Sequence, residues 1–315
     1  MEKVKLMFDV GGTVTKSGVF TDAGDNLLPE LIYTPTAADC SGPQFVAEMV
    51  QHCLNLVAKL PEPVLICAVG WAFPGPFDYQ RGISQMHGLH KFEQLAGYDL
   101  ATAFKKSLSA TALNLLPDWS LFFANDALSF AFGEAALHDQ ERCGGYFTIG
   151  TGLGSAFLRA GQQLQACGRL PKSGMIFGEP FGESTIDEQL SGRGLVQLCQ
   201  RQGITAGLPQ VTAAAALGDP ASLAVLAEFG QRLGLGLGPY LVELAVDEVV
   251  FGGQVSRGFP YFEMSFRQTL ARQGISPEIR ASLDTSLRTI QGLNYLAARS
   301  TMTTKSASCE NGGFS

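Results

Sequence analysis

Two neighbouring polar residues interrupt an apolar stretch of the sequence. The run Leu121–Ala124 ends at Asn125 and Asp126, and a helical pattern begins directly afterwards. In open α/β sheets, ligands bind in the crevice where strands give way to helices. A carboxylate at such a place either caps the helix or accepts a proton from a substrate, and this stretch alone leaves both interpretations open.

Two glycine-rich turns offer phosphate-binding chemistry. They read Asp9-Val-Gly-Gly-Thr13 and Gly150-Thr-Gly-Leu-Gly154, and each lies between two predicted strands. A Walker A loop would end in Gly-Lys-Ser/Thr, and a Rossmann fingerprint would lead into a helix. Glycine lets backbone N–H groups converge on an anion, and a threonine hydroxyl adds a donor. Each turn alone also fits an ordinary hairpin, but one such turn in each half of the chain predicts two loops that close on a polyphosphate.

Asp9 and a third glycine pair extend this set. A carboxylate beside bound phosphates is repelled unless a cation lies between them, so Asp9 predicts Mg²⁺, held partly through water. Alternatively, Asp9 caps the hairpin as an Asx-turn residue. Gly252 and Gly253 end another predicted strand, where a nucleobase or ribose can lie against the backbone, although strands followed by two glycines are also common in plain turns.

Two halves with a related order of elements must position these residues. Apolar alternation predicts strands at 3–10, 16–20, 31–34, 64–71, 121–124, 146–149, 155–159 and 248–251. Helical spacing predicts helices at 42–60, 127–137, 185–201, 221–244, 261–273 and 292–298. We therefore expect an α/β fold with two domains around a central cleft, residues 4–132 and 133–291. The helix 292–298 is expected to pack back on the first domain, and residues 300–315 to form a flexible tail.

Composition and charge argue against several classes of protein. The 315 residues are 46% hydrophobic and 16% charged, which is typical of a compact globular chain. The net charge of −7 and the pI near 5.2 argue against nucleic acid as a partner, because such binders carry a basic face. The seven cysteines contain no C-x-x-C pair, so neither a disulfide framework nor a zinc knuckle is predicted. Without a signal peptide or a long apolar stretch, a cytoplasmic protein with no membrane partner is expected.

Taken in order, the motifs resemble those of the ROK sugar kinases, which belong to the actin-like, sugar-kinase and Hsp70 superfamily. The motifs are Asp9-Val-Gly-Gly-Thr13, Pro74-Gly75 with Asp78, Asn125-Asp126, Gly150-Thr-Gly-Leu-Gly154 and Gly252-Gly253. The resemblance covers residues 4 to 298. It implies two ribonuclease-H-like (actin-like ATPase) domains around an ATP cleft, with a sugar bound at the base of the cleft.

The resemblance also implies roles for individual residues. Asp126 would be the general base, and Asn125 and Gly75 would bind the sugar; phosphoryl transfer needs such a base besides positioning and metal neutralisation. The implied ATP- and phosphate-binding residues are Asp9, Gly11, Gly12, Thr13, Lys16, Gly150, Thr151, Gly152, Gly154, Gly252 and Gly253. The implied cofactors are ATP and Mg²⁺, the implied partner is a sugar, and a homodimer is expected.

The chain departs from the family pattern in its sugar-binding loops. Many ROK members carry Glu-x-Gly-His, then a cysteine-rich zinc loop, then a glutamate before Ser-Gly. Here Glu179 is followed by Pro-Phe-Gly and no cysteine cluster, so Glu179 is expected to hold a sugar hydroxyl and no zinc site is expected. By register Asp187 replaces the family's glutamate, with Glu188 as the alternative. His87 or His90 stands in the loop where many members have a sugar-binding asparagine, although a lone loop histidine is more often simply solvated.

The leading functional expectation is an ATP-dependent hexose or N-acetylhexosamine kinase of the glucokinase type, with polyphosphate as an alternative donor. Some relatives are sugar-responsive repressors, but they carry a helix-turn-helix segment before the first glycine motif, and only eight residues precede Asp9 here. Another alternative is a catalytically degenerate relative that acts as a sugar-binding or regulatory module, which the missing histidine suggests.

Overall fold

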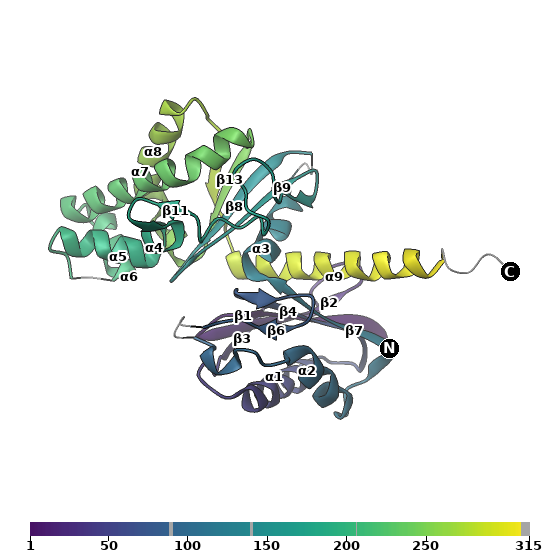
Figure 1. Cartoon of the computed structure of the whole chain (residues 1–315). Coiled ribbons are helices and arrows are strands. Elements are labelled where there is room, and N and C mark those ends of the chain that lie inside the picture. Colours follow the sequence, from purple (N-terminus) through teal and green to yellow (C-terminus); the bar gives the residue numbers. More distant parts are fainter. Residues whose placement is uncertain (88–90, 139–140, 206, 310–315) are drawn as a thin grey trace. The chain divides into compact units, whose positions relative to one another are not determined.

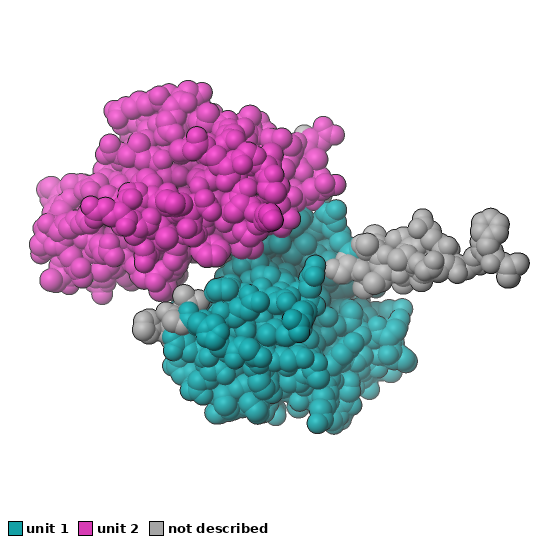
Figure 2. Space-filling model, in the orientation of Figure 1, with its two compact units in different colours: residues 1–133, 286–315 teal, residues 134–285 magenta. Residues whose placement is uncertain are grey.

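The computed structural model describes residues 1–87, 91–138, 141–205 and 207–309, and the chain divides into two compact units. Unit 1 is formed by 1–133 together with 286–315, and unit 2 by 134–285 (Figure 2). Each unit contains a five-stranded sheet accompanied by helices. The α/β fold class predicted from the sequence is therefore confirmed.

Unit 1 is built on the sheet β3-β2-β1-β4-β7. Its strands are β1 (Glu2–Val10), β2 (Val14–Thr21), β3 (Ile32–Pro35), β4 (Val64–Phe73), β5 (Phe77–Asp78), β6 (Ile83–Ser84) and β7 (Leu115–Asn125). Its helices are α1 (Gly42–Val57), the 3-10 helix η1 (Glu93–Leu95), α2 (Leu100–Ser109), and α3 (Asp126–Ala135) and α9 (Thr285–Cys309) at the unit boundary. The strands β3, β2 and β1 are antiparallel, whereas β1, β4 and β7 are parallel.

Both faces of this sheet are covered. Helices α1 and α2 lie against one face and α9 against the other (Figure 1). On the first face, Trp71 stacks between Phe8 at 4.2 Å and Phe104 at 4.6 Å between ring centroids, which joins β1, β4 and α2. On the second face, Ile290 and Leu293 of α9 belong to a separate buried cluster. Covering both faces explains the nearly continuous apolar run of β4, because neither side of that strand faces water.

Unit 2 repeats this arrangement on the sheet β10-β9-β8-β13-β14. Its strands are β8 (Cys143–Ile149), β9 (Leu153–Arg159), β10 (Gln162–Gln163), β11 (Pro180–Phe181), β12 (Ser184–Thr185), β13 (Glu248–Gly252) and β14 (Glu278–Ala281). Its helices are α4 (Ile186–Leu190), α5 (Gly192–Arg201), α6 (Leu208–Ala216), α7 (Pro220–Glu243), the 3-10 helix η2 (Gln254–Gly258) and α8 (Phe259–Arg272). Again an antiparallel half (β10, β9, β8) continues into a parallel half (β8, β13, β14), so the predicted repetition of strand-turn-strand units is confirmed.

Several elements differ from the sequence prediction. The helix predicted at 185–201 is two helices, because Ser191 is extended (ψ −177°) and its side chain accepts a hydrogen bond from the N–H of Arg193 at the start of α5. Helix α2 was not predicted, although Leu100, Phe104 and Leu108 form its buried face. The final helix is longer than 292–298 and includes residues of the predicted tail up to Cys309. Residues 310–315 lie outside the described part of the chain.

Within the described part of the chain, no single helix has the length and apolarity to span a membrane. Helices α6 and α7 reach that length and apolarity only when taken together, and the pair is bent by 116°.

Candidate active site

The carboxyl ends of the parallel strands in unit 1 bring the predicted catalytic residues together. Asp9 on β1 is in register with Ala72 on β4, and Ala72 is in register with Ala124 on β7. Two strand spacings separate β1 from β7, which amounts to about 10 Å between their backbones. Asp9, Asn125 and Asp126 therefore gather at one edge of the sheet, where side chains from β1 and from the start of α3 can act on one ligand.

Asn125 provides the cap of helix α3. Its Oδ1 accepts a hydrogen bond from the N–H of Leu128 at 3.0 Å, which is the geometry of an N-cap residue. The hydroxyl of Ser129 donates to the carbonyl of Asn125 at 2.8 Å and strengthens the same first turn. Asp126 is the first residue of the helix, and its Oδ1 accepts a hydrogen bond from the adjacent N–H of Ala127 at 2.8 Å. The capping role that the sequence left open for Asp126 is thus filled by its neighbour.

Tyr79 orients Asn125, a function that sequence reasoning did not find. The Tyr79 hydroxyl donates to the carbonyl of Phe73 at 3.0 Å and accepts from Nδ2 of Asn125 at 3.0 Å. Burial, with the Asp126 charge as a smaller cause, raises the pKa of Tyr79, so the hydroxyl stays protonated. Gly75 lies beside this pair, since a Cβ on Gly75 would come within 3.3 Å of the Tyr79 oxygen. The structure therefore brings Gly75 and Asn125 together, as the proposed sugar-binding role requires.

The two carboxylates at this edge influence each other. Burial and the negative charge of Asp9 raise the pKa of Asp126 from 3.8 to about 6, although hydrogen bonds from backbone N–H groups oppose the shift. Burial also raises the pKa of Asp9, and the ion pair with Lys16, 3.0 Å between Nζ and Oδ2, acts in the opposite direction. A carboxylate with a pKa near 6 is suited to accept a proton near neutral pH.

The carboxylate of Asp9 would suit a magnesium ion. Mg²⁺ is usually bound by one or two carboxylates together with substrate phosphates and water. The negative charge of Asp9 is one cause of the raised pKa of Asp126, and a cation held at Asp9 would offset that charge. Asp9 is the residue that would hold the ion, since only its Oδ2 is engaged by Lys16.

The first glycine turn is closely packed at both of its glycines. A Cβ on Gly11 would lie 2.8 Å from the carbonyl oxygen of Val14, and a Cβ on Gly12 would lie 2.9 Å from Cε of Lys91. The contact at Gly11 is with the backbone, so a larger residue there would force the turn open, whereas the flexible side chain of Lys91 could move aside for a larger residue at position 12. Thr13 is exposed at the turn, and its carbonyl accepts a hydrogen bond from the N–H of Thr36 at 2.9 Å.

The glycine motifs of unit 2 also meet one another. The N–H of Gly150 donates to the carbonyl of Gly152 at 2.9 Å and closes the second turn, in which Thr151 is exposed and from which Gly154 continues into β9. Gly252 pairs with Thr148, so β13 ends beside this turn. Gly253 has φ +86°, and a Cβ there would lie 2.7 Å from the carbonyl carbon of Ile149. The motifs 150–154 and 252–253 thus lie side by side and carry few side-chain atoms, which suits a nucleotide lying against the backbone.

Asp187 lies at this second turn. Its Oδ1 accepts a hydrogen bond from the N–H of Leu153 at 2.6 Å, and its Oδ2 forms an ion pair with Arg193. Glu188, the alternative in the sequence register, forms a capping box with Thr185 at the start of α4. Arg193 was not singled out in the sequence, because a lone arginine after Ser-Gly carries no spacing signal.

Glu179, His87 and His90 complete the set of predicted site residues. Glu179 of unit 2 is half-buried, and its charge is the second cause, after burial, that raises the pKa of Tyr240. His87 of unit 1 is exposed. His90 lies outside the described residues.

Substitution of Gly152 tests the second turn. A Cβ on Gly152 would lie 2.9 Å from Oδ1 of Asp187 and would displace this carboxylate from the N–H of Leu153. For Gly152→Val we expect the KM for the nucleotide to rise about tenfold or more, as lost charge-assisted contacts to phosphate imply. The affinity for the sugar is expected to change little. Separate titrations of nucleotide and sugar measure the two effects.

Asp187→Ala is the matched control for this experiment. It removes the carboxylate but leaves the turn open, so it separates loss of the Asp187 contact from obstruction by the valine side chain. A nucleotide KM that stays at the wild-type value in Gly152→Val would mean that the turn has only a structural role.

Comparison with known proteins places this geometry in a family. The family model described as "ROK family" matches residues 6–298. The ROK hexokinase from Thermus thermophilus is 19% identical, with a TM-score of 0.70 over 94% of this chain and 99% of that one. The ROK family glucokinase from Streptomyces griseus, solved with glucose and AMPPNP, is 18% identical, with a TM-score of 0.70 over 93% of this chain and 98% of that one.

A regulator is similar to the same degree. A ROK family transcriptional regulator, a homolog of the E. coli MLC protein, is 16% identical, with a TM-score of 0.73 over 97% of this chain and 81% of that one. No curated protein matches the sequence. At these identities the solved structures establish the fold, whereas the family model spans nearly the whole sequence. The chain belongs to the ROK family.

Proposed function

We propose that this protein is a sugar kinase that transfers a phosphoryl group from ATP to a hydroxyl of a hexose or an N-acetylhexosamine. The observation that carries the proposal is the state of Asp126, a carboxylate with a pKa raised to about 6 beside an asparagine that already caps the helix. A residue needed only for the cap would not have to keep a charged group half-buried next to a second carboxylate.

In the proposed reaction, the sugar hydroxyl oxygen attacks the terminal phosphorus of the donor while the bond to the leaving ADP oxygen breaks. Asp126 takes up the hydroxyl proton, and Asn125, held by Tyr79, orients the sugar. The first glycine turn and Lys16 bind phosphate oxygens through N–H groups and a positive charge. Mg²⁺, when bound, neutralises charge on the phosphates.

The ADP released over a panel of sugars, with and without Mg²⁺, tests this proposal directly. We expect Mg²⁺-dependent turnover with at least one hexose or N-acetylhexosamine. Replacing ATP by inorganic polyphosphate in the same panel identifies the donor. The absence of turnover with every sugar and both donors would contradict the kinase proposal.

A catalytically degenerate sugar-binding or regulatory protein is the second candidate. It is favoured by Gly182, which stands where the family pattern has its histidine. It is also favoured by Asp187, whose carboxylate already accepts a hydrogen bond from the N–H of Leu153 at the second turn. Such a protein would be stabilised against heat by a sugar without forming a phosphorylated product. Thermal unfolding with each sugar of the panel therefore distinguishes the two candidates.

The pKa of Asp126 predicts a pH dependence of the reaction. Only the ionised carboxylate accepts a proton, so kcat/KM is expected to fall as the pH decreases through about 6. Rates measured from pH 5 to pH 8 give the apparent pKa. The nucleotide phosphates titrate in a similar range, at about 6. In the residual activity of Asp126→Asn, a limb caused by Asp126 is absent, whereas one caused by the nucleotide remains. An apparent pKa near 6 that is the same in wild type and in Asp126→Asn would contradict the assignment of the base.

A further inference from the structure

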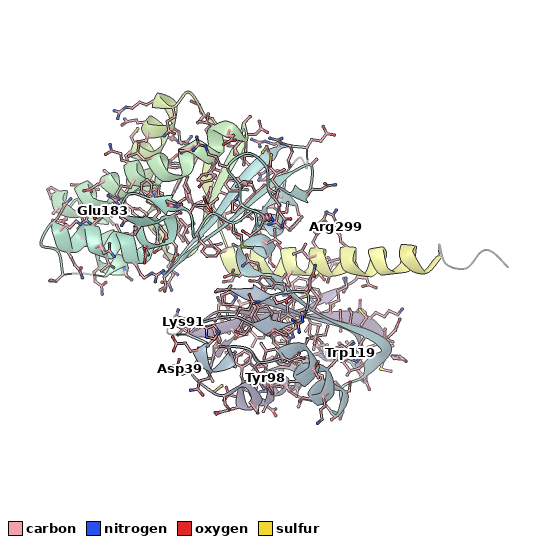
Figure 3. All side chains as sticks on the ribbon, viewed as in Figure 1. Asp39, Lys91, Tyr98, Trp119, Glu183 and Arg299 are labelled. Carbon is pink, nitrogen blue, oxygen red and sulfur yellow. The ribbon has the colours of Figure 1, made fainter. Side chains whose placement is uncertain are left out.

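The side chain of Lys91 lies over the first glycine turn. A Cβ built on Gly12 would lie 2.9 Å from Cε and 3.0 Å from Nζ of Lys91, so the lysine side chain lies against the turn at position 12. Figure 3 labels this lysine side chain on unit 1. Lys91 is only half-buried, so its ammonium group remains accessible to a ligand. The turn therefore carries a cation that its own sequence motif does not contain.

The backbone around Lys91 is held in this position. The next residue, Phe92, is 1% exposed, and its ring lies 5.1 Å from that of Phe73, between centroids, in the core of unit 1. The N–H of Phe92 donates to the carbonyl of Ala38 at 2.9 Å. Two residues earlier along that segment, Thr36 is hydrogen-bonded to the turn residue Thr13. Lys91 is thus connected to the glycine turn through backbone hydrogen bonds as well as through its side chain.

Lys16 and Lys91, two lysines at the turn, differ in their pairing. Lys16 lies on the other side, with its Nζ 3.5 Å from a Cβ built on Gly11, but it is paired with Asp9 at 3.0 Å. Across the described ranges, Lys91 has neither an ion-pair partner nor a side-chain hydrogen bond. An anion that approaches the turn would therefore meet one neutralised and one unpaired ammonium group.

We propose that Lys91 binds the terminal phosphate of a polyphosphate chain, the group that is transferred to the sugar. This inference rests on the proposed kinase function and adds a phosphate-binding residue outside the glycine motif. An ammonium group binds phosphate as a point charge, and the transferred group carries charge on its three equatorial oxygens. The terminal phosphate is the group that must lie near Asp126, which belongs to the same unit as Lys91. ATP and inorganic polyphosphate share this terminal group.

Three variants test the assignment in the full chain. Lys91→Met keeps most of the stem but removes the charge, and Lys91→Arg restores a charge. Lys59→Met is the matched control, because Lys59 is an exposed lysine just beyond α1, away from the turn. Calorimetry with inorganic tripolyphosphate and, separately, with ATP, both with Mg²⁺, measures donor binding without any sugar. Initial rates with a sugar substrate provide kcat and KM.

For Lys91→Met we expect the affinity for tripolyphosphate to fall about 10- to 100-fold, with a shallower dependence of affinity on salt. Lys91→Arg is expected to recover most of the affinity, and Lys59→Met to equal the wild type. A comparable loss for ATP assigns the contact to both donors, whereas a loss for tripolyphosphate alone assigns it to polyphosphate.

The proposal is overturned if wild type does not bind tripolyphosphate, if Lys91→Met binds it like wild type, or if Lys59→Met loses as much affinity. These outcomes are separate from the test of the kinase function. A protein that phosphorylates no sugar but loses tripolyphosphate affinity in Lys91→Met would contradict the kinase proposal and support the phosphate contact. A protein that phosphorylates a sugar, but whose donor affinity and kcat are unchanged in Lys91→Met, would support the kinase proposal and contradict the phosphate contact of Lys91.

Discussion

Replacement of Asp126 by asparagine is expected to lower kcat by about 10²- to 10⁴-fold, because the amide cannot accept the sugar hydroxyl proton. The affinity for the sugar should change little, since the amide can still form a hydrogen bond with the hydroxyl. The helix cap is preserved, because the accepting group for the N–H of Leu128 belongs to Asn125. Steady-state kinetics and a sugar titration of the same variant measure both effects.

The same substitution is expected to stabilise the fold. The pKa of Asp126 is raised from 3.8 to about 6 in the folded protein, so the unfolded carboxylate ionises first as the pH rises. The folded state therefore loses stability between about pH 4 and pH 6, and above that range the loss is complete, at most about 3 kcal/mol. Asparagine has no charge and avoids the loss. The Tm of Asp126→Asn should exceed that of wild type at pH 7, and the difference should shrink towards pH 4.

Higher stability together with lower turnover is the pattern of a residue kept for chemistry. If Asp126 were required only for the start of α3, the variant would keep its kcat. A variant that retains most of its kcat would therefore contradict the proposed mechanism, even if its stability changed as described.

Substitution of Gly292 by alanine is expected to destabilise unit 1 and to slow turnover. A Cβ on Gly292 would overlap the carbonyl oxygen of Ser129 and lie 2.5 Å from the backbone nitrogen of Gly133, so α9 and α3 touch through their backbones. Alanine in a helix is intrinsically more favourable than glycine by up to about 1 kcal/mol. Overpacking typically costs about 1–3 kcal/mol, so the net effect is a lower Tm by several degrees.

The effect on turnover follows from the position of Ser129. This residue lies on α3 one turn beyond Asp126, so a shift of α3 away from α9 moves the proposed base. A displacement of about 1 Å can cost about 10²-fold in rate. Thermal unfolding and kcat are measured on the same preparation. A Tm equal to or above that of wild type would show that the two helices separate without strain, and would contradict the predicted contact.

The gathering of Asp9, Asn125 and Asp126 at one edge of unit 1 could be predicted because local patterns encode it. An apolar run that stops at Asn125 and Asp126, and a Gly-Gly turn after Asp9, identify strand ends, and parallel strands bring their carboxyl ends to one edge. The sequence could not show which of Asn125 and Asp126 caps helix α3, because both residue types cap helices well. It depends on which side chain Leu128 contacts, and that follows from the exact start of α3.

Contacts between segments that are far apart in the sequence could not be predicted from it. Tyr79 binds Asn125 across 46 positions, and Lys91 reaches Gly12 from a segment without a motif. Neither residue type is specific enough to indicate a partner so far along the chain. The break between α4 and α5 was missed for a related reason, since it depends on the contact of Gly192 with Gly150 and not on a breaker residue such as proline.

The split sequence of unit 1 has a consequence for folding during synthesis. Ile290, Leu293 and Ala297 of α9 cover a sheet face that includes Met7 and Phe20. About 150 residues, all of unit 2, separate the first part of unit 1 from α9. At roughly 5–20 residues per second, a ribosome takes on the order of ten to thirty seconds to make them. During that interval this one face of the sheet lacks its covering helix, so we expect unit 2 to be able to complete its core before unit 1 does.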